Sequence, residues 1–175
     1  MRLLPAFVIA MLALPVAQAA AQSSSCEGFM THMQKALPDL DPKFVRPVIV
    51  SRGTGPRGDT RDMVVKLRID GQLTCDGDRF VRFEARIQEP STPPLRDAFF
   101  RVQQAAAIYK LRWSSAHASR ELQGMTAEAA DYLRASVERE DFSIAGKVER
   151  HAGEAGDVGL IWTRNDRTFI LVEYQ

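Results

Sequence analysis

Apolar residues recur at spacings of three and four in several segments, the pattern of a helix buried on one side. The clearest case follows the helix-start signal Ser91-Thr92-Pro93-Pro94 and extends to Trp113. Shorter patterns predict helices over residues 27–37 and 126–140, the second with a threonine N-cap. The segment 114–123 is left open between a loop and a helical turn.

Alternating apolar and polar residues predict the strands. Residues 62–69 and 79–87 each place apolar side chains on one face and charged side chains on the other. We expect them to pair as a hairpin, with Cys75 in the connection. Other strands are expected at residues 48–50, 142–148, 158–163 and 168–174, with a turn at Arg164–Arg167 between the last two.

The order of these elements predicts the fold class. Helix, three strands, two helices and three strands (α-βββ-αα-βββ) indicate an α+β fold in which an antiparallel sheet packs against helices. The sequence Ile170-Leu171-Val172 is apolar on both faces, so we expect its strand to be central in the sheet. Residues 22–175 have the length of one domain and are expected to form a single α+β domain.

Residues 1–21 resemble a secretory signal peptide. Arg2 supplies one positive charge, Leu3–Val16 is almost purely apolar, and Ala17-Gln18-Ala19 offers small residues to a signal peptidase. Cleavage is expected near Ala19 to Ala21. The apolar core is shorter than the roughly 20 residues of a membrane-spanning helix. The sequence therefore predicts a periplasmic or secreted protein with no membrane span.

The charge balance limits the classes of partner. The chain has 23 Lys and Arg residues against 22 Asp and Glu residues, and Arg2 is the only charged residue of the predicted signal peptide. The remaining chain is formally neutral, which argues against binding to nucleic acid or to an anionic membrane surface.

Cys26 and Cys75 are the only cysteines. In an oxidising compartment such a pair is expected to form a disulfide, which would close a loop of about 50 residues and stabilise the fold by about 4 kcal/mol. Two separate thiols are the alternative. A redox pair is disfavoured because there is no C-x-x-C motif, and Ser23 to Ser25 do not provide the apolar residue of a lipoprotein signal before Cys26.

A glycine-rich loop is predicted at residues 51–61, with the sequence SRGTGPRGDTR. It contains a G-x-G-x-x-G match and an Arg-Gly-Asp tripeptide, but a strand rather than a helix follows, so dinucleotide binding is not expected. Arg52, Arg57 and Arg61 could together hold an anion or an acidic partner. Solvating charges on a long polar loop are the simpler interpretation.

Candidate catalytic and metal-binding residues are few. Glu149, His151, Glu154 and Asp157 could ligate a divalent ion, but their spacing fits no known metal motif, and a solvated turn explains them equally well. The predicted mature chain lacks G-x-S-x-G, H-E-x-x-H and S-x-x-K. The sequence therefore assigns no catalytic residue, metal or cofactor.

Export, neutral charge, single-domain size and the lack of a catalytic motif favour a soluble, non-enzymatic binding or accessory protein that contacts another exported protein. A small-ligand carrier with a pocket between helices and sheet is the alternative, followed by an enzyme with an unrecognised site. A deep pocket would favour the carrier, and a flat or concave sheet face with exposed aromatic side chains would favour the partner-binding protein.

Overall fold

Residues 25–45, 59–65, 68–140 and 145–173 are those that the computed structural model of this protein describes. They form the helices α1 (Cys26–Ala36), α2 (Pro93–Leu111) and α3 (Ser115–Glu138), and a short 3-10 helix, η1 (Gly153–Ala155). The strands are β1 (Lys43–Phe44), β2 (Asp59–Val65), β3 (Ile69–Asp76), β4 (Arg79–Gln88), β5 (Gly146–His151), β6 (Asp157–Trp162) and β7 (Asp166–Val172). The predicted α+β class and the α-βββ-αα-βββ order are confirmed, with the two-residue β1 as an additional strand.

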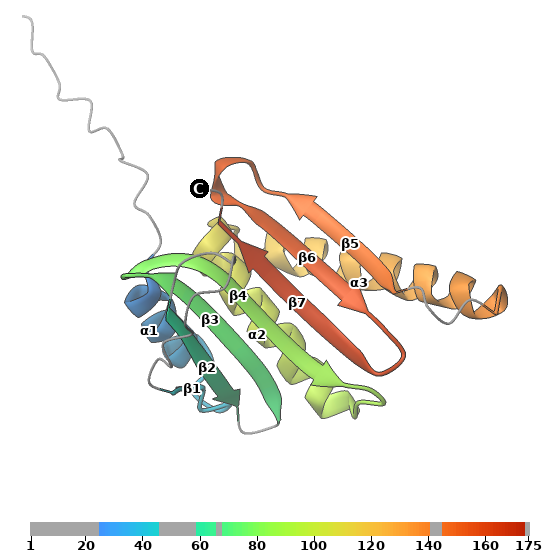
Figure 1. The fold of residues 1–175 in the computed structure, drawn as a ribbon, viewed down its shortest axis with the longest axis horizontal. Helices are drawn as coiled ribbons and strands as arrows, with labels where there is room; N and C mark the ends of the chain where they lie inside the picture. Colours follow the sequence, from blue (N-terminus) through green and yellow to red (C-terminus); the bar gives the residue numbers. More distant parts are fainter. Residues whose placement is uncertain (1–24, 46–58, 66–67, 141–144, 174–175) are drawn as a thin grey trace, which may run out of the picture.

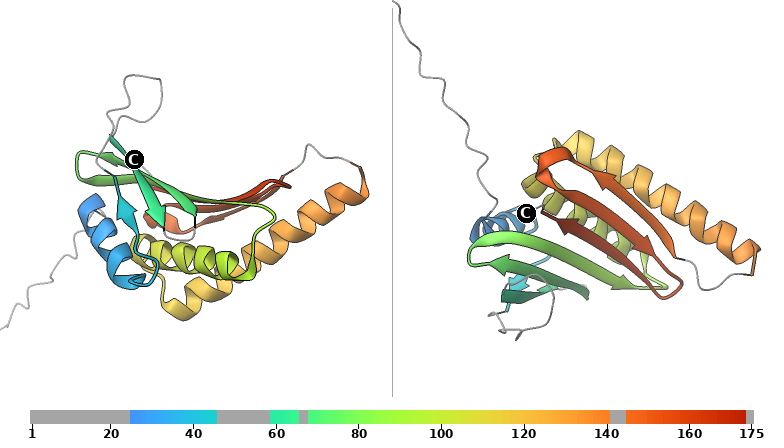
Figure 2. Two further views of the ribbon diagram at one scale, coloured as in Figure 1. Left: turned by 90° about the horizontal axis from the view of Figure 1, so that it is seen from below. Right: turned by 45° about the horizontal axis from the view of Figure 1, so that its top comes forward.

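The described strands form one antiparallel sheet in the order β1-β2-β3-β4-β7-β6-β5 (Figure 1). The strand β7, predicted to be central, lies between β4 and β6. All three α-helices lie against the same face of the sheet, and the C-terminal end of α3 extends past the sheet edge (Figure 2). The inner face of the sheet is therefore the face covered by these helices.

Alternation along the strands builds the core. In β4, Phe83, Ala85 and Ile87 are buried on the inner face, whereas Arg82 and Arg86 lie on the opposite, open face. The open face carries mostly polar and charged side chains joined by ion pairs such as Arg82–Glu84 and Arg86–Asp166. It is therefore the water-facing side of a two-layer α+β fold.

Two helices begin at serine caps. The Ser25 hydroxyl accepts a hydrogen bond from the Gly28 amide at α1, and the Ser114 hydroxyl accepts one from the His117 amide at α3. The helix α2 starts with two prolines after Thr92 and ends where Arg112 adopts a left-handed conformation. The start of α2 agrees with the helix predicted from the helix-start signal at residues 91–94.

The helix α3 is longer than predicted. It begins at Ser115 instead of Thr126, and the Thr126 hydroxyl donates to the Leu122 carbonyl inside the helix. The prediction that Thr126 is an N-cap is wrong. The buried face of α3 includes small residues such as Ala118 and Ala129, whose weak apolar periodicity did not predict the first half of the helix.

The first predicted hairpin is also wrong. The strand expected at 62–69 ends as β2 at Val65, and a separate strand, β3, starts at Ile69. β3 pairs with both β2 and β4, so Cys75 lies within a strand and not in a connection. The turn expected at Arg164–Arg167 is shorter, because β7 already starts at Asp166.

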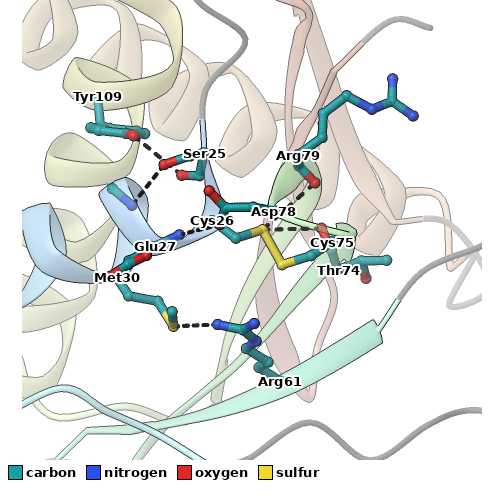
Figure 3. Close-up of a disulfide and its surroundings, with 11 residues drawn as sticks. Ser25, Cys26, Glu27, Met30, Arg61, Thr74, Cys75, Asp78, Arg79 and Tyr109 are labelled. Atoms are coloured by element: carbon teal, nitrogen blue, oxygen red, sulfur yellow. Dashed lines mark hydrogen bonds between the residues drawn. A yellow bond between two sulfur atoms is a disulfide. The ribbon is translucent and has the colours of Figure 1, made fainter.

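The predicted disulfide is confirmed. Cys26 and Cys75 are joined by an S–S bond of 2.04 Å, and both side chains are fully buried. Figure 3 shows the bond linking the first turn of α1 to the end of β3, beside Met30 and Arg61. A backbone hydrogen bond of 2.7 Å from the Cys26 amide to the Asp78 carbonyl reinforces the same junction.

A buried ion pair fixes the end of the last strand. The Lys110 ammonium on α2 lies 2.8 Å from a carboxylate oxygen of Glu173, and their side chains are only 3% and 15% exposed. The ammonium also lies 5.4 Å from the centroid of the Phe80 ring. The C-terminal end of β7 is thus attached to the helix layer.

Several predictions fall outside the described residues: the signal peptide over 1–21, the strand over 48–50, and the apolar positions Phe142 and Ile144. Within the described part of the chain, no helix is both long enough and apolar enough to cross a membrane.

Candidate functional site

A cavity of about 270 Å³ lies between α2, α3 and the inner face of the sheet. We call it the Arg167 cavity. It is lined by Arg96, Asp97, Phe99, Phe100 and Gln103 from α2, by Gln123 and Thr126 from α3, by Leu160 from β6 and by Arg167 from β7. Charged, amide and apolar side chains thus meet in one partly open space.

Arg167 is on the inner face because of strand alternation. Phe169 and Leu171 are buried core residues of β7, and Arg167 lies two positions before Phe169 on the same face. Its neighbour across the β6–β7 hairpin is Trp162. The guanidinium carbon lies only 3.4 Å from the centroid of the indole ring, so the two planes stack.

One carboxylate compensates the charge of Arg167. Glu89 forms an ion pair with Nε of Arg167, and the two side chains are 11% and 13% exposed. Ser91 holds the same carboxylate, with its backbone amide 2.8 Å from one oxygen and its hydroxyl 3.1 Å from both. Glu89 is therefore fixed by partners from both sides.

A second guanidinium joins this network. Arg96 donates a hydrogen bond of 2.6 Å to the carbonyl oxygen of Ser91, and its positive charge acts on Arg167. Burial is the main cause that lowers the pKa of Arg167, Glu89 opposes this effect, and the charge of Arg96 adds to it. Two guanidinium groups thus lie at this end of the cavity, and the Glu89 carboxylate pairs with one of them, Arg167.

Gln103 contributes a buried amide. Its side chain belongs to a residue that is only 3% exposed, and it lines the cavity from the middle of α2. Among the described residues, no side-chain hydrogen bond reaches this amide. The amide nitrogen and oxygen are not among the fully buried polar atoms without a partner, so they border the open space of the cavity, where they are available to a ligand.

The apolar part of the lining comes from three residues. Phe99 and Leu160 are buried core residues, and Phe100 packs beside them while remaining partly exposed. The Thr126 hydroxyl donates to the Leu122 carbonyl within α3. The cavity lining therefore combines apolar side chains with two guanidinium groups.

The polar groups of the lining are mostly hydrogen-bond donors. Among the described lining residues, the carboxylate is that of Asp97, which is an exposed residue. The donors of the lining are guanidinium and amide groups, which orient an anion or a carbonyl oxygen.

The structure describes only one of the three arginines predicted to form an anion-binding loop. Arg61 lies in β2, and one of its terminal nitrogens is 3.3 Å from the sulfur of Met30, beside the disulfide (Figure 3). Arg52 and Arg57 lie outside the described residues. The anion-binding loop stays a prediction.

The four residues weighed as metal ligands do not form one site. The imidazole of His151 contacts Asp157 at 2.9 Å across the β5–β6 hairpin, whereas Glu149 pairs with Lys147. Glu154 lies in η1 and is exposed. Within the described ranges, no group of three or more His, Cys, Asp or Glu side chains is placed to hold a metal ion.

A pocket between helices and sheet was an alternative from the sequence, but none of its lining residues was predicted, although two signals were present. The period of two that makes Phe169 and Leu171 inward-facing also places Arg167 inward. On α2, Gln103 follows the buried Phe99 by four residues and so falls on the buried stripe. Arg167 and Gln103 are polar residues at positions where the strand and helix patterns are otherwise apolar, and this mismatch was the signal available in the sequence.

Searches of protein-family models, curated proteins and solved structures found no match to this chain. The function is therefore argued from the geometry of the Arg167 cavity.

Proposed function

We propose that this protein is an exported binding protein that holds a small organic molecule in the Arg167 cavity. The observation that carries the proposal is the Gln103 amide, which is almost fully buried, lacks a side-chain partner among the described residues, and faces the cavity. The amide borders the cavity space, so a ligand that enters can exchange hydrogen bonds with this amide for those made to water.

The cavity has the size and place of a small-ligand site. Its volume of about 270 Å³ lies just below the range of roughly 300–1,000 Å³ occupied by drug-sized ligands. Sites of this kind combine an apolar lining with a few convergent polar groups, as Phe99 and Leu160 do with Gln103.

Contact with another exported protein, the first expectation from the sequence, stays a prediction. The described open face of the sheet carries ion pairs such as Arg82–Glu84 in place of exposed aromatic side chains. Large exposed apolar residues are few in the described chain and scattered: Val45, Val64, Tyr132 and Val137. The described surface therefore gives weaker support to a partner-binding function than the cavity gives to a small-ligand carrier.

The test is binding of two small aromatic probes, hydrocinnamate and hydrocinnamamide, observed by ¹H–¹⁵N NMR of the folded protein. At least one of the probes is expected to shift the amide signals of Phe100, Gln103 and Leu160. The variant Thr126→Met should abolish these shifts, because a longer flexible side chain occupies the cavity.

Ala127→Met is the matched control, because it adds the same side chain at an exposed position of the same helix. It should bind the probes as the wild type does. Shifts that survive Thr126→Met, or no shift with either probe up to its solubility limit, would contradict the proposed function.

A further inference from the structure

We infer that the Arg167 cavity is selective for a monoanionic carboxylate with a flat apolar body. This inference rests on the proposed function and assigns the chemical class of its ligand. It follows from three features of the cavity: its charge, the shape of its donors and the size of its apolar part.

The charge around Arg167 is unbalanced by one. Arg96 and Arg167 are both positive, Glu89 pairs with Arg167, and among the described residues no ion pair joins Arg96 to a carboxylate. Both oxygens of the Glu89 carboxylate already have partners, which are Ser91 and Arg167. Asp97 lies at an exposed position, where water screens its charge. One further negative charge would complete the pairing of the two guanidinium groups.

The donors match a carboxylate. A guanidinium presents its N–H groups in a planar fork that pairs with the two oxygens of a carboxylate. The face of the Arg167 guanidinium lies against the Trp162 ring, and Glu89 pairs with Nε, so the guanidinium is held in one plane. Such a fixed guanidinium loses little conformational freedom when it binds an anion. The Gln103 amide adds a neutral donor on the same helix as Arg96.

The apolar part sets the size of the ligand body. A cavity of about 150 Å³ accepts benzene. The 270 Å³ here therefore accommodates a molecule of about ten non-hydrogen atoms. Phe99, Phe100 and Leu160 provide the surface on which an aromatic ring or a branched alkyl chain would lie.

Charge separates a carboxylate from a phosphate ester. A phosphate monoester carries close to two negative charges at neutral pH. This is more than the single positive charge that remains around Arg167 after Glu89 is counted. The second charge would enter a partly buried site without a counterion, which costs free energy. We therefore expect the carboxylate to bind more tightly than a phosphate ester of the same size.

The test compares three probes of similar size by isothermal titration: hydrocinnamate, its neutral amide hydrocinnamamide, and phenyl phosphate. Hydrocinnamate should bind the wild type at least about tenfold more tightly than the amide, which corresponds to one charge-assisted hydrogen-bond pair. Equal affinity for acid and amide, or tighter binding of phenyl phosphate, would overturn the carboxylate class while leaving the proposed binding function intact. If none of the probes binds, the binding function itself fails.

Variants locate the selectivity. Arg96→Gln should remove the preference for the acid, measured as the ratio of the affinities for hydrocinnamate and hydrocinnamamide. Arg101→Gln on the same helix changes the charge equally, but Arg101 pairs with exposed Asp39 outside the cavity, so the preference should remain. If Arg96→Gln does not fold, Arg96→Met provides the test, because it also removes the charge and keeps an unbranched side chain. A preference for the acid that survives in a folded variant without the Arg96 charge would overturn the inference.

Discussion

The two ends of helix α2 contact the same sheet in different ways. At its C-terminal end, Tyr109 reaches α1, where its hydroxyl donates to the Ser25 carbonyl and its ring meets Phe29 edge-on at 5.7 Å. Phe29 in turn contacts the rings of Phe80 and Phe83, which fill the space between helix and sheet. At its N-terminal end, the same layer holds Arg96, Arg167 and the cavity.

The difference shows how a cavity can persist in a stable fold. Aromatic rings close the first region, and a disulfide fixes it. In the second region, covering guanidinium and amide groups with apolar side chains would cost desolvation energy without a compensating hydrogen bond. We infer that the well-packed end supplies stability and that the polar end keeps an open volume.

The largest expected effect comes from removing the disulfide. Cys26→Ala with Cys75→Ala should lower the free energy of unfolding by about 4 kcal/mol, because the bond closes a loop of 49 residues in sequence. Urea denaturation measures this loss. Probe binding by the folded variant should persist, because the bond lies at the other end of the helix layer. A loss below about 1 kcal/mol would contradict the assignment of stability to this end.

Glu89→Gln should have the next largest effect, a loss of about 2 kcal/mol in the free energy of unfolding, because Arg167 would lose its buried counterion. Breaking a fully buried ion pair would lower the free energy of unfolding more, but Arg167 lines a cavity, so the expected loss is smaller. Asp39→Asn is the control, since it breaks the exposed pair with Arg101 and should leave thermal denaturation unchanged. If the two variants unfold alike, the ion pair at the cavity has no special role.

Two leucine substitutions compare the regions directly. Phe29→Leu should cost about 1 kcal/mol, because it leaves space in a filled aromatic cluster. Gln103→Leu should change stability by less than about 0.5 kcal/mol, because the amide borders the cavity and makes no side-chain hydrogen bond within the described residues. Chemical denaturation measures both, and a clearly destabilising Gln103→Leu would indicate that the amide supports the fold of the free protein.

The smallest expected effect is a pH dependence at the packed end. Burial lowers the pKa of His32, the hydrogen bond with the Ala105 carbonyl opposes this, and the charges of Arg112 and Lys35 add to the lowering. The unfolded state therefore binds the proton more readily than the folded state. Stability contributed by neutral His32 should be complete above about pH 6.5 and decrease as the pH falls from there toward the lowered pKa.

Comparing denaturation midpoints of wild type and His32→Gln between about pH 7 and pH 5.5 measures this effect. Glutamine keeps a donor for the Ala105 carbonyl without the titrating ring, so the variant should show a smaller decrease. The same decrease in both proteins would show that other groups are responsible.

The parts of the fold that could be predicted have strong local signals. The helix from the 91–94 signal, the alternation of Phe83, Ala85 and Ile87, and the pairing of two lone cysteines depend on neighbouring residues or on composition. They gave the correct class and element order. The signal peptide and the arginine loop involve residues outside the described ranges, so those predictions stand as they were.

The errors arise where distant residues decide the local structure. Asp70-Gly71 suggests a turn, but Gly71 lies within β3 opposite Met63, where an added Cβ would come within 2.6 Å of the Met63 side chain. Gly71 therefore continues the strand beside Met63 and forms no turn. The cavity likewise brings together four elements, and no local pattern shows that Arg96 and Arg167 line the same cavity.

The outermost described strand on the β5 side also affects how molecules behave toward one another. β5 is held to β6 on one side only, so its other backbone edge could extend the sheet into a neighbouring copy. Four of its six residues have ionisable side chains: Lys147, Glu149, Arg150 and His151. Charges along an edge strand oppose pairing between molecules. This composition should help the protein to resist aggregation through its sheet edge at high concentration.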